Sequence, residues 1–186
     1  MNKKWFKEYL ELYRTPLFDD EIYLKLIELK DFMEKVNMKG CKTMILGNGG
    51  SAAIASHVSV DFSKNAKIRV INFNEADLIT CLANDYGYEK WMSKAVDIYG
   101  DKGDQVILIS SSGNSKNVVE AAITAKKNQH RVITFTGFDK TNSLKSHGDL
   151  NFWVNSKAYN IVEMIHQIWL LSVCDAIIGN AEYPAS

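Results

Sequence analysis

Two short apolar segments of this chain each run directly into a turn rich in glycine, serine and asparagine, and each turn leads into a helix-forming segment. Thr43–Leu46 is followed by Gly47–Ser51, and Val106–Ile109 is followed by Ser110–Ser115. In a strand–turn–helix unit, free backbone N–H groups and the helix N-terminus point toward a bound anion or a hydroxylated ligand. One such turn is common in α/β proteins, but two in one small domain indicate a site for a phosphorylated sugar.

Short strand-like segments alternate with helical segments from residue 43 onward, which predicts a parallel sheet with helices on both faces. Residues 107–109 (Ile-Leu-Ile) lack polar alternation, as expected for a strand that is covered on both faces. The predicted strands are Thr43–Leu46, Ile68–Phe73, Val106–Ser110, Val132–Thr136 and Leu150–Val154. The predicted helices are Ser51–Ser63, an irregular stretch over Ala76–Tyr99, Lys116–Asn128 and Ile161–Ile178.

The chain is predicted to form one domain over residues 1–186, because it contains no repeat and no flexible linker. Residues 1–40 are expected to be helical and used in oligomerisation, with Thr15-Pro16 separating two helices, and residues 41–186 are expected to form the α/β core. The last helix, 161–178, is apolar on nearly all sides and therefore needs cover on nearly all sides. The domain can cover one face, and another subunit or the N-terminal helices must cover the rest; oligomerisation through this helix is favoured over complete burial in the domain core.

Composition excludes several classes of partner. The 186 residues include 22 basic and 22 acidic residues and are 46% hydrophobic, so no net charge attracts the chain to nucleic acid or to an anionic membrane. No signal-peptide pattern and no window of about 18 apolar residues is found in the sequence. Cys41, Cys81 and Cys174 are widely spaced in apolar sequence and are predicted to be buried and reduced. A soluble, cytoplasmic protein without a membrane segment is expected.

The second turn carries four serine hydroxyls around Gly113-Asn114. A helix cap uses one hydroxyl, or two at most, whereas four neutral donors beside free helix N–H groups suit a phosphate monoester. No P-loop lysine follows Gly113, which argues against a nucleoside triphosphate. The predicted phosphate-binding hydroxyls are those of Ser110, Ser111, Ser112 and Ser115.

The first turn does not fit the dinucleotide-binding fingerprint, so no nucleotide cofactor is expected. Its side chains and exposed backbone suit a sugar hydroxyl or carbonyl oxygen instead. The predicted ligand-binding residues of this turn are Asn48, Gly49, Gly50 and Ser51. Asn84-Asp85 lies in a second polar segment, interpreted either as a simple Asx turn or as a loop that closes over the ligand.

Two acid–histidine pairs are candidates for chemistry. His57 and Asp61 stand at i and i+4 on the helix after the first turn, and Glu163 and His166 stand at i and i+3 on the last helix. Two facing pairs can hold a divalent metal or share proton transfer. A solvated surface pair at His57 and a buried structural network at His166 are the alternatives, and the residues alone do not decide between them.

Taken together, these segments resemble the sugar isomerase (SIS) fold and, within it, the phosphoheptose isomerases. Those enzymes convert sedoheptulose 7-phosphate to a heptose phosphate, the first step toward the heptoses of bacterial surface polysaccharides. The resemblance spans nearly the whole chain. The segments that carry it are Gly47–Ser51 with His57, Ala83–Tyr88, Ile109–Ser115 and Val132–Gly137.

The resemblance implies an α/β fold, a three-layer αβα sandwich with a five-stranded parallel sheet and N-terminal helices. It also implies homotetramers with active sites between subunits, and often a bound zinc ion. Substrate contacts are expected at Asn48, Gly49, Gly50, Ser51, Asn84, Asp85, Ser110, Ser111, Ser112 and Ser115.

The resemblance also implies the catalytic residues. The family's catalytic glutamate falls at Asp61, and its glutamine on the last helix falls at Glu163, which makes Asp61 and Glu163 the expected acid–base pair. His57, Asp61 and Glu163 are the expected metal ligands. The family's second histidine falls at Leu171, which can neither bind a metal nor transfer a proton.

Three functions therefore fit the sequence. The first is aldose–ketose isomerisation of sedoheptulose 7-phosphate for lipopolysaccharide or capsule synthesis. The second is isomerisation of another phosphosugar. The third is a phosphosugar-binding adaptor without catalysis, similar to the DnaA initiator-associating protein. The two retained carboxylates, Asp61 and Glu163, favour an enzyme, because an adaptor gains nothing from negative charge beside a bound anion.

Overall fold

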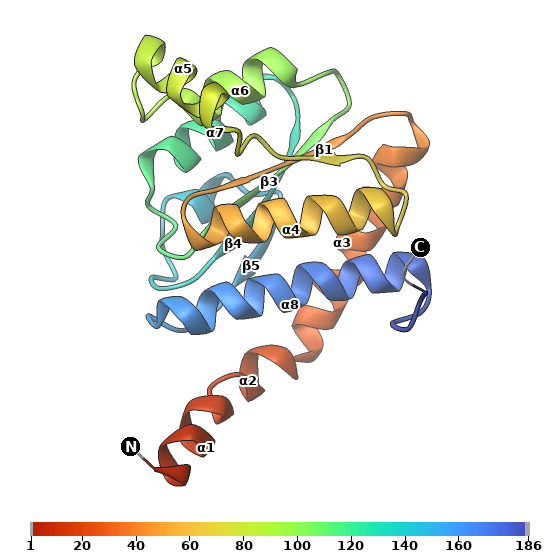
Figure 1. The fold of residues 1–186 in the computed structure, drawn as a ribbon, viewed down its shortest axis with the longest axis vertical. Helices are drawn as coiled ribbons and strands as arrows, with labels where there is room; N and C mark the ends of the chain where they lie inside the picture. Colours follow the sequence, from red (N-terminus) through yellow and green to blue (C-terminus); the bar gives the residue numbers. More distant parts are fainter. Residues whose placement is uncertain (1, 185–186) are drawn as a thin grey trace.

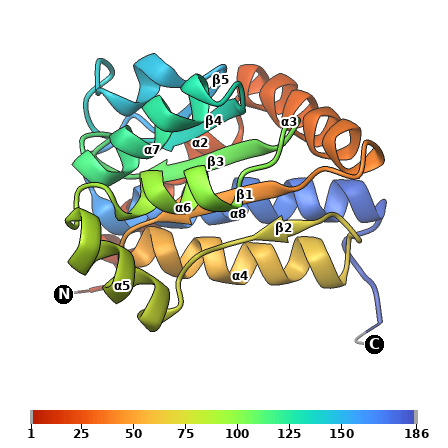
Figure 2. The same ribbon diagram turned by 90° about the horizontal axis from the view of Figure 1, so that it is seen from above.

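The computed structural model describes residues 2–184, which form an α/β fold built on one five-stranded sheet. All strand pairs are parallel, in the order β2-β1-β3-β4-β5. The strands are β1 (Thr43–Gly47), β2 (Val70–Ile71), β3 (Gln105–Ser110), β4 (Arg131–Thr136) and β5 (Leu150–Trp153). The predicted αβα sandwich is therefore confirmed (Figure 2).

The register of the central strands brings the two polar turns together. β1 pairs with β3 from Thr43 opposite Gln105 to Gly47 opposite Ile109. The chain continues from β1 to β2 on one side of the sheet and later enters β3 on the other side, so the strand order reverses at β1. In open α/β sheets, ligands bind at the carboxyl ends of the strands where the order reverses. The glycine turn after β1 and the serine loop after β3 both begin at that point.

Helices cover both faces of the sheet, and each face has its own apolar core (Figure 1). Side chains alternate along the strands: Ile45 and Ile107 face one core, whereas Met44 and Leu46 face the other. The first core is covered by α3 (Asp20–Met38), α4 (Gly50–Lys64) and α8 (Tyr159–Ile178). The second core is covered by α5 (Ala76–Tyr86), α6 (Trp91–Tyr99) and α7 (Lys116–Lys127), with the short 3₁₀ helix η1 (Leu144–His147) beside it.

The N-terminal segment extends away from the sheet before it joins the domain (Figure 1). α1 (Lys3–Glu11) has no buried residue, whereas α3 packs against the core through Leu29 and Met33. Thr15-Pro16 lies between the two long N-terminal helices α1 and α3, as predicted, but the two residues themselves belong to a short helix, α2 (Arg14–Leu17). A proline in the first turn of a helix loses no hydrogen bond, since the first N–H groups have no partner within the helix.

Two further predictions of local structure need correction. The irregular stretch 76–99 consists of two regular helices, and Asn84 and Asp85 lie in the last turn of α5 rather than in a loop. Gly87, with φ of 86°, ends that helix in a conformation that glycine adopts readily. The expected burial of all three cysteines is also wrong. Cys174 is buried, but Cys41 is only half-buried and Cys81 is exposed on α5.

α8 is mainly a core helix. Eight of its residues are buried inside the domain, among them Trp169 and Leu170, and only an apolar strip that includes Met164 and Ile168 stays exposed. The domain itself therefore covers more of this helix than the sequence analysis predicted. By length and mean hydropathy alone α8 could cross a membrane, although Glu163, His166 and Asp175 interrupt its apolar sequence. Its packing against the sheet is that of the central helix of a soluble domain.

Candidate active site

A cavity of about 260 Å³ lies at the carboxyl ends of β1 and β3. It is lined by the glycine turn, the serine loop and the first residues of α8. The lining residues are Asn48, Gly49, Gly50, Ser51, Ile109, Ser110, Ser111, Ser112, Ser115, Tyr159 and Glu163. The structure thus brings together nine of the residues that the sequence analysis assigned to the site, from three separate parts of the chain.

Two helices begin at this cavity, and neither has a side-chain cap. α4 follows Gly49, whose φ of 54° is in the region that favours glycine, and α7 follows Ser115. Gly49 has no side chain to cap α4, and the Ser115 side chain accepts no hydrogen bond from the first turn of α7. The first N–H groups of a helix have no partner within the helix, and the helix dipole favours negative charge there. Both helix ends are therefore suited to bind an anion.

The serine loop holds three of its hydroxyls by internal hydrogen bonds. Ser110 Oγ lies 3.3 Å from Ser115 Oγ and accepts the N–H of Gly113 at 3.2 Å. Ser112 Oγ accepts the N–H of Asn114 at 3.2 Å. The Ser111 hydroxyl is buried and has no hydrogen-bond partner in the described part of the chain. A buried hydroxyl without a partner is costly, so Ser111 is the hydroxyl that gains most from a bound ligand.

The Asn48 side chain is fixed by neighbours that the sequence analysis did not single out. Its amide group exchanges two hydrogen bonds of 2.9 Å with the amide of Asn117 on α7. The Tyr88 hydroxyl donates to the same Asn48 oxygen at 3.2 Å. Asn48 therefore joins the two helix N-termini, and this role depends on contacts between distant segments that no local pattern reveals.

Glu163 places a carboxylate at the start of α4. It packs so closely on Gly50 that a Cβ at Gly50 would overlap the carboxylate oxygens. Partial burial raises the pKa of the Glu163 carboxyl group above its ordinary value. Tyr159, one turn earlier on the same face of α8, also lines the cavity and was not predicted. The cavity therefore combines an anion-binding end with a titratable carboxylate.

His57 and Asp61 lie farther along the seam between α4 and α8 and do not line the cavity. His57 Nε2 is 3.3 Å from an Asp61 carboxylate oxygen, and His57 Nδ1 is 2.9 Å from the Gln167 side-chain nitrogen. Leu171, one turn beyond Gln167, packs against the apolar core. Within residues 2–184, no group of three His, Cys, Asp or Glu side chains is close enough to hold a metal ion. The predicted ligand set of His57, Asp61 and Glu163 is therefore not brought together.

Of the two alternatives left open for Glu163 and His166, the structure supports the buried structural one for His166. His166 is fully buried, and its Nε2 is 3.0 Å from the carbonyl oxygen of Thr136 at the end of β4. Desolvation lowers its pKa to about 4, so the imidazole is neutral at physiological pH. Because residues at i and i+3 differ by about 60° around a helix, Glu163 reaches the cavity while His166 points into the core. His166 has a structural role.

Asn84 and Asp85 do not line this cavity. Both are solvent-exposed at the end of α5, where the Asn84 amide donates to the Asp85 carboxylate at 3.0 Å. Within a single chain, the expectation that they contact the ligand has no support from the geometry.

Comparison with known proteins identifies the family. The model of the SIS domain family matches residues 17–137. The phosphoheptose isomerase of Fusobacterium nucleatum is 32% identical over 177 residues, covering 92% of this chain and 91% of that protein. The phosphoheptose isomerase of Campylobacter concisus is 31% identical over 185 residues, covering 95% and 97%.

Solved structures agree. The phosphoheptose isomerase GmhA from Neisseria gonorrhoeae superimposes with a TM-score of 0.83 at 27% identity, covering 94% of this chain and 98% of that one. The Francisella tularensis phosphoheptose isomerase has the same fold, with a TM-score of 0.84 at 23% identity, covering 96% and 99%. The chain therefore belongs to the SIS domain family and, within it, to the phosphoheptose isomerases.

Proposed function

We propose that the protein converts sedoheptulose 7-phosphate to an aldose heptose phosphate, and that this step feeds heptose synthesis for lipopolysaccharide or capsule. The observation that carries the proposal is the cavity itself. The serine loop and the uncapped N-terminus of α7 stand on one side of the cavity, and the uncapped N-terminus of α4 with the Glu163 carboxylate stands on the other. Phosphoheptose isomerases are the relatives to which the chain is similar over nearly its full length.

The phosphate group binds at the serine loop in this proposal. The free N–H groups of α7 and the unpartnered Ser111 hydroxyl supply donors without fixed positive charge. The reacting carbons of the sugar then lie toward α4 and α8, where the Gly49-Gly50 backbone and Glu163 form the wall. Anchoring the phosphate fixes the sugar relative to the carboxylate, which converts proton transfer into an intramolecular step.

Glu163 is the group best suited to move the proton. Isomerisation removes a proton from C1 of the ketose, forms an enediol and returns a proton to C2, while a proton also passes between the two oxygens. A base works best when its pKa is near the working pH, and burial shifts the Glu163 pKa in that direction. Asp61 was expected to share this role, but it is paired with His57 outside the cavity walls. We assign the base to Glu163 and a supporting role to Asp61.

Removing the Ser111 hydroxyl tests the phosphate site. The Ser111→Ala variant is expected to raise KM by roughly 10- to 100-fold, because a hydrogen bond to a charged group contributes about 1.5–3 kcal/mol. Its folding stability is expected to stay unchanged or to rise, since the hydroxyl has no hydrogen-bond partner among residues 2–184. Steady-state kinetics and thermal unfolding measure both effects. Ser143→Ala, an exposed serine outside the cavity, is the control, and an equal KM in all three proteins would contradict the phosphate assignment.

Zinc fits the described residues only in part. His57 and Asp61 are adjacent and would hold the ion, and bound zinc would polarise the substrate oxygens. Catalytic zinc sites use three protein ligands, and the neighbouring positions Gln167 and Leu171 carry an amide and an apolar side chain. We therefore propose that this chain turns over its substrate without tightly bound zinc. Dialysis against a chelator is expected to change kcat by less than about twofold, and a loss that zinc restores would contradict this.

A homotetramer in the cytoplasm completes the proposal. Apolar side chains of α1 and of Phe18, the residue after α2, need cover that residues 2–184 of a single chain do not provide: Phe6 is 57% exposed, Leu10 62% and Phe18 73%. Three free cysteines suit a reducing compartment. In a tetramer, the exposed Asn84 and Asp85 would be available to a neighbouring site. Light scattering coupled to size-exclusion chromatography tests the assembly, and a monomeric mass would contradict it.

A further inference from the structure

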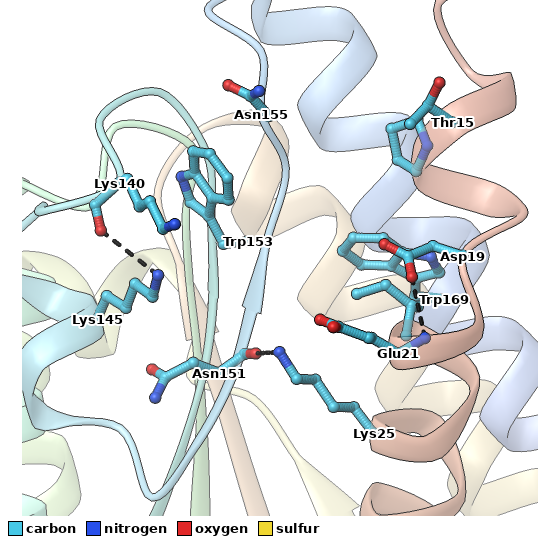
Figure 3. Close-up of a pocket in the computed structure, with 12 residues that line it drawn as sticks. Thr15, Asp19, Glu21, Lys25, Lys140, Lys145, Asn151, Trp153, Asn155 and Trp169 are labelled. Atoms are coloured by element: carbon cyan, nitrogen blue, oxygen red, sulfur yellow. Dashed lines mark hydrogen bonds between the residues drawn. The ribbon is translucent and has the colours of Figure 1, made fainter.

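A second cavity, of about 300 Å³, lies beside the edge strand β5 and shares no residue with the candidate active site. Its walls come from α2, from the start of α3, from the segment after β4 and from β5 itself, with α8 behind them (Figure 3). Figure 3 shows side chains of both charges directed into this space, with Trp153 between them. The cavity is at the lower end of the size range of small-molecule sites.

Three lysines line this cavity and lack a carboxylate partner. Among residues 2–184, neither Lys25, Lys140 nor Lys145 is within 4 Å of an acidic group. Lys25 donates to the backbone oxygen of Asn151 at 3.2 Å, and Lys145 donates to the backbone oxygen of Lys140 at 3.4 Å. Both ammonium groups are thus held in place by neutral acceptors, and their charge is left uncompensated.

The lysines are close enough to affect one another. Burial lowers the pKa of Lys145, and the charges of Lys140 and Lys25 lower it further. Lys145 also lies over the Trp153 ring, with Nζ 5.3 Å from the ring centroid, which orients the ammonium group. A bound anion would relieve this repulsion, and a phosphate group carries enough charge to interact with more than one lysine.

The opposite wall offers acceptors for hydroxyl groups. The Asp19 carboxylate is occupied, because it accepts the N–H of Glu21 at 2.9 Å as the N-cap of α3. The side chains of Glu21 and Asn155 also line the cavity, and in the described part of the chain neither has a hydrogen-bond or ion-pair partner. The cavity therefore has a cationic side, an aromatic wall and a polar side that can accept hydrogen bonds from hydroxyls.

We propose that this cavity is a second binding site for a phosphorylated sugar. The phosphate binds between Lys25, Lys140 and Lys145, the apolar face of the sugar ring packs on Trp153, and the hydroxyls bond to Glu21 and Asn155. A purely apolar ligand would leave the three ammonium groups unpaired, and an unphosphorylated sugar would do the same. The site is independent of the proposed isomerisation, since none of these residues belongs to the active-site cavity.

Calorimetry with glucose 1-phosphate tests the proposal. This probe cannot be isomerised, because its phosphate blocks the anomeric carbon. The Ser111→Ala/Ser112→Ala double variant weakens binding of the probe in the active-site cavity. Any binding that remains then takes place at the second site. Adding Lys140→Gln and Lys145→Gln is expected to weaken that binding at least tenfold, whereas Lys39→Gln with Lys127→Gln, two exposed lysines elsewhere, is expected to leave it unchanged. Unphosphorylated glucose is expected not to bind.

A fluorescence titration keeps the test valid if the serine variant does not fold. In the otherwise unchanged protein, glucose 1-phosphate is expected to change tryptophan emission, and Trp153→Phe is expected to remove most of that change. The Lys140→Gln/Lys145→Gln variant is expected to retain full isomerase turnover. The proposal is overturned if binding is equal with and without the two lysines, if the control pair weakens it equally, or if no second binding event occurs. The binding measurements do not depend on whether the protein is an isomerase; only the turnover measurement does.

Discussion

Replacing Glu163 by glutamine is expected to lower kcat for sedoheptulose 7-phosphate by roughly 10²- to 10⁴-fold, the range contributed by a positioned acid–base group. Glutamine keeps the size and polarity of the side chain, so its contact with Gly50 is preserved while the titratable group is lost. The variant is expected to bind the phosphosugar as tightly as the unchanged protein or more tightly, because a negative charge next to the bound phosphate is removed. Kinetics and calorimetry on the same preparation separate the two effects.

Asp61→Asn is the matched control for this prediction. Asp61 contacts His57 and Asn65 along the seam between α4 and α8, and it does not line the cavity. Loss of the Asp61 carboxylate is expected to reduce kcat by less than tenfold, because it changes only the orientation of the His57 ring. If Asp61→Asn abolishes turnover and Glu163→Gln leaves it intact, the base is Asp61, and the assignment of Glu163 made from the cavity geometry is wrong.

The folded protein is expected to lose stability as the pH falls from 6.5 to 4, because of the buried imidazole of His166. His166 is buried and neutral, with a pKa of about 4 compared with an ordinary value of 6.5. Below pH 6.5 the unfolded chain gains a proton at this residue that the folded chain does not bind. The free energy of unfolding therefore falls by about 1.4 kcal/mol per pH unit as pH decreases from 6.5 to 4, a total of about 3 kcal/mol.

Urea unfolding at several pH values measures this slope, and His166→Gln isolates its source. Glutamine can still donate a hydrogen bond to the Thr136 carbonyl, but it does not titrate. Between pH 4 and 6.5 the variant is expected to take up about one proton fewer on unfolding, so its free energy of unfolding depends less steeply on pH. His130, whose pKa is also lowered by burial, would still contribute to the remaining slope. An identical slope in both proteins would show that His166 is not the buried neutral group described above.

The parts of the site that depend on local sequence were predictable. An apolar run followed by glycine or serine and then by a helix former specifies a strand–turn–helix unit, and a parallel sheet places both turns at one edge. The positions of Gly49, Gly50, Ser111 and Ser112 follow from that reasoning alone.

The parts that depend on tertiary packing were not predictable. Spacing at i and i+3 left open whether Glu163 and His166 act together, whereas the structure places His166 in the core against the Thr136 carbonyl, which also accepts the Val154 N–H. Turn-forming residues at Asn84-Asp85 suggested a loop, whereas the helix continues until Gly87. Asn117 and Tyr88 contact Asn48 from 69 and 40 residues away, and that separation leaves no periodic signal.

Turnover of sedoheptulose 7-phosphate in D₂O, followed by NMR, shows directly whether Glu163 moves a proton between C1 and C2. An aldose heptose phosphate with deuterium at C2 is expected, because the carboxylate exchanges its proton with solvent before returning it to the enediol. Glu163→Gln is expected to form little or no aldose. Tight binding of the phosphosugar without any aldose, in protein with full occupancy of the site, would contradict the proposed function and would identify a phosphosugar-binding protein that is not an isomerase of this substrate.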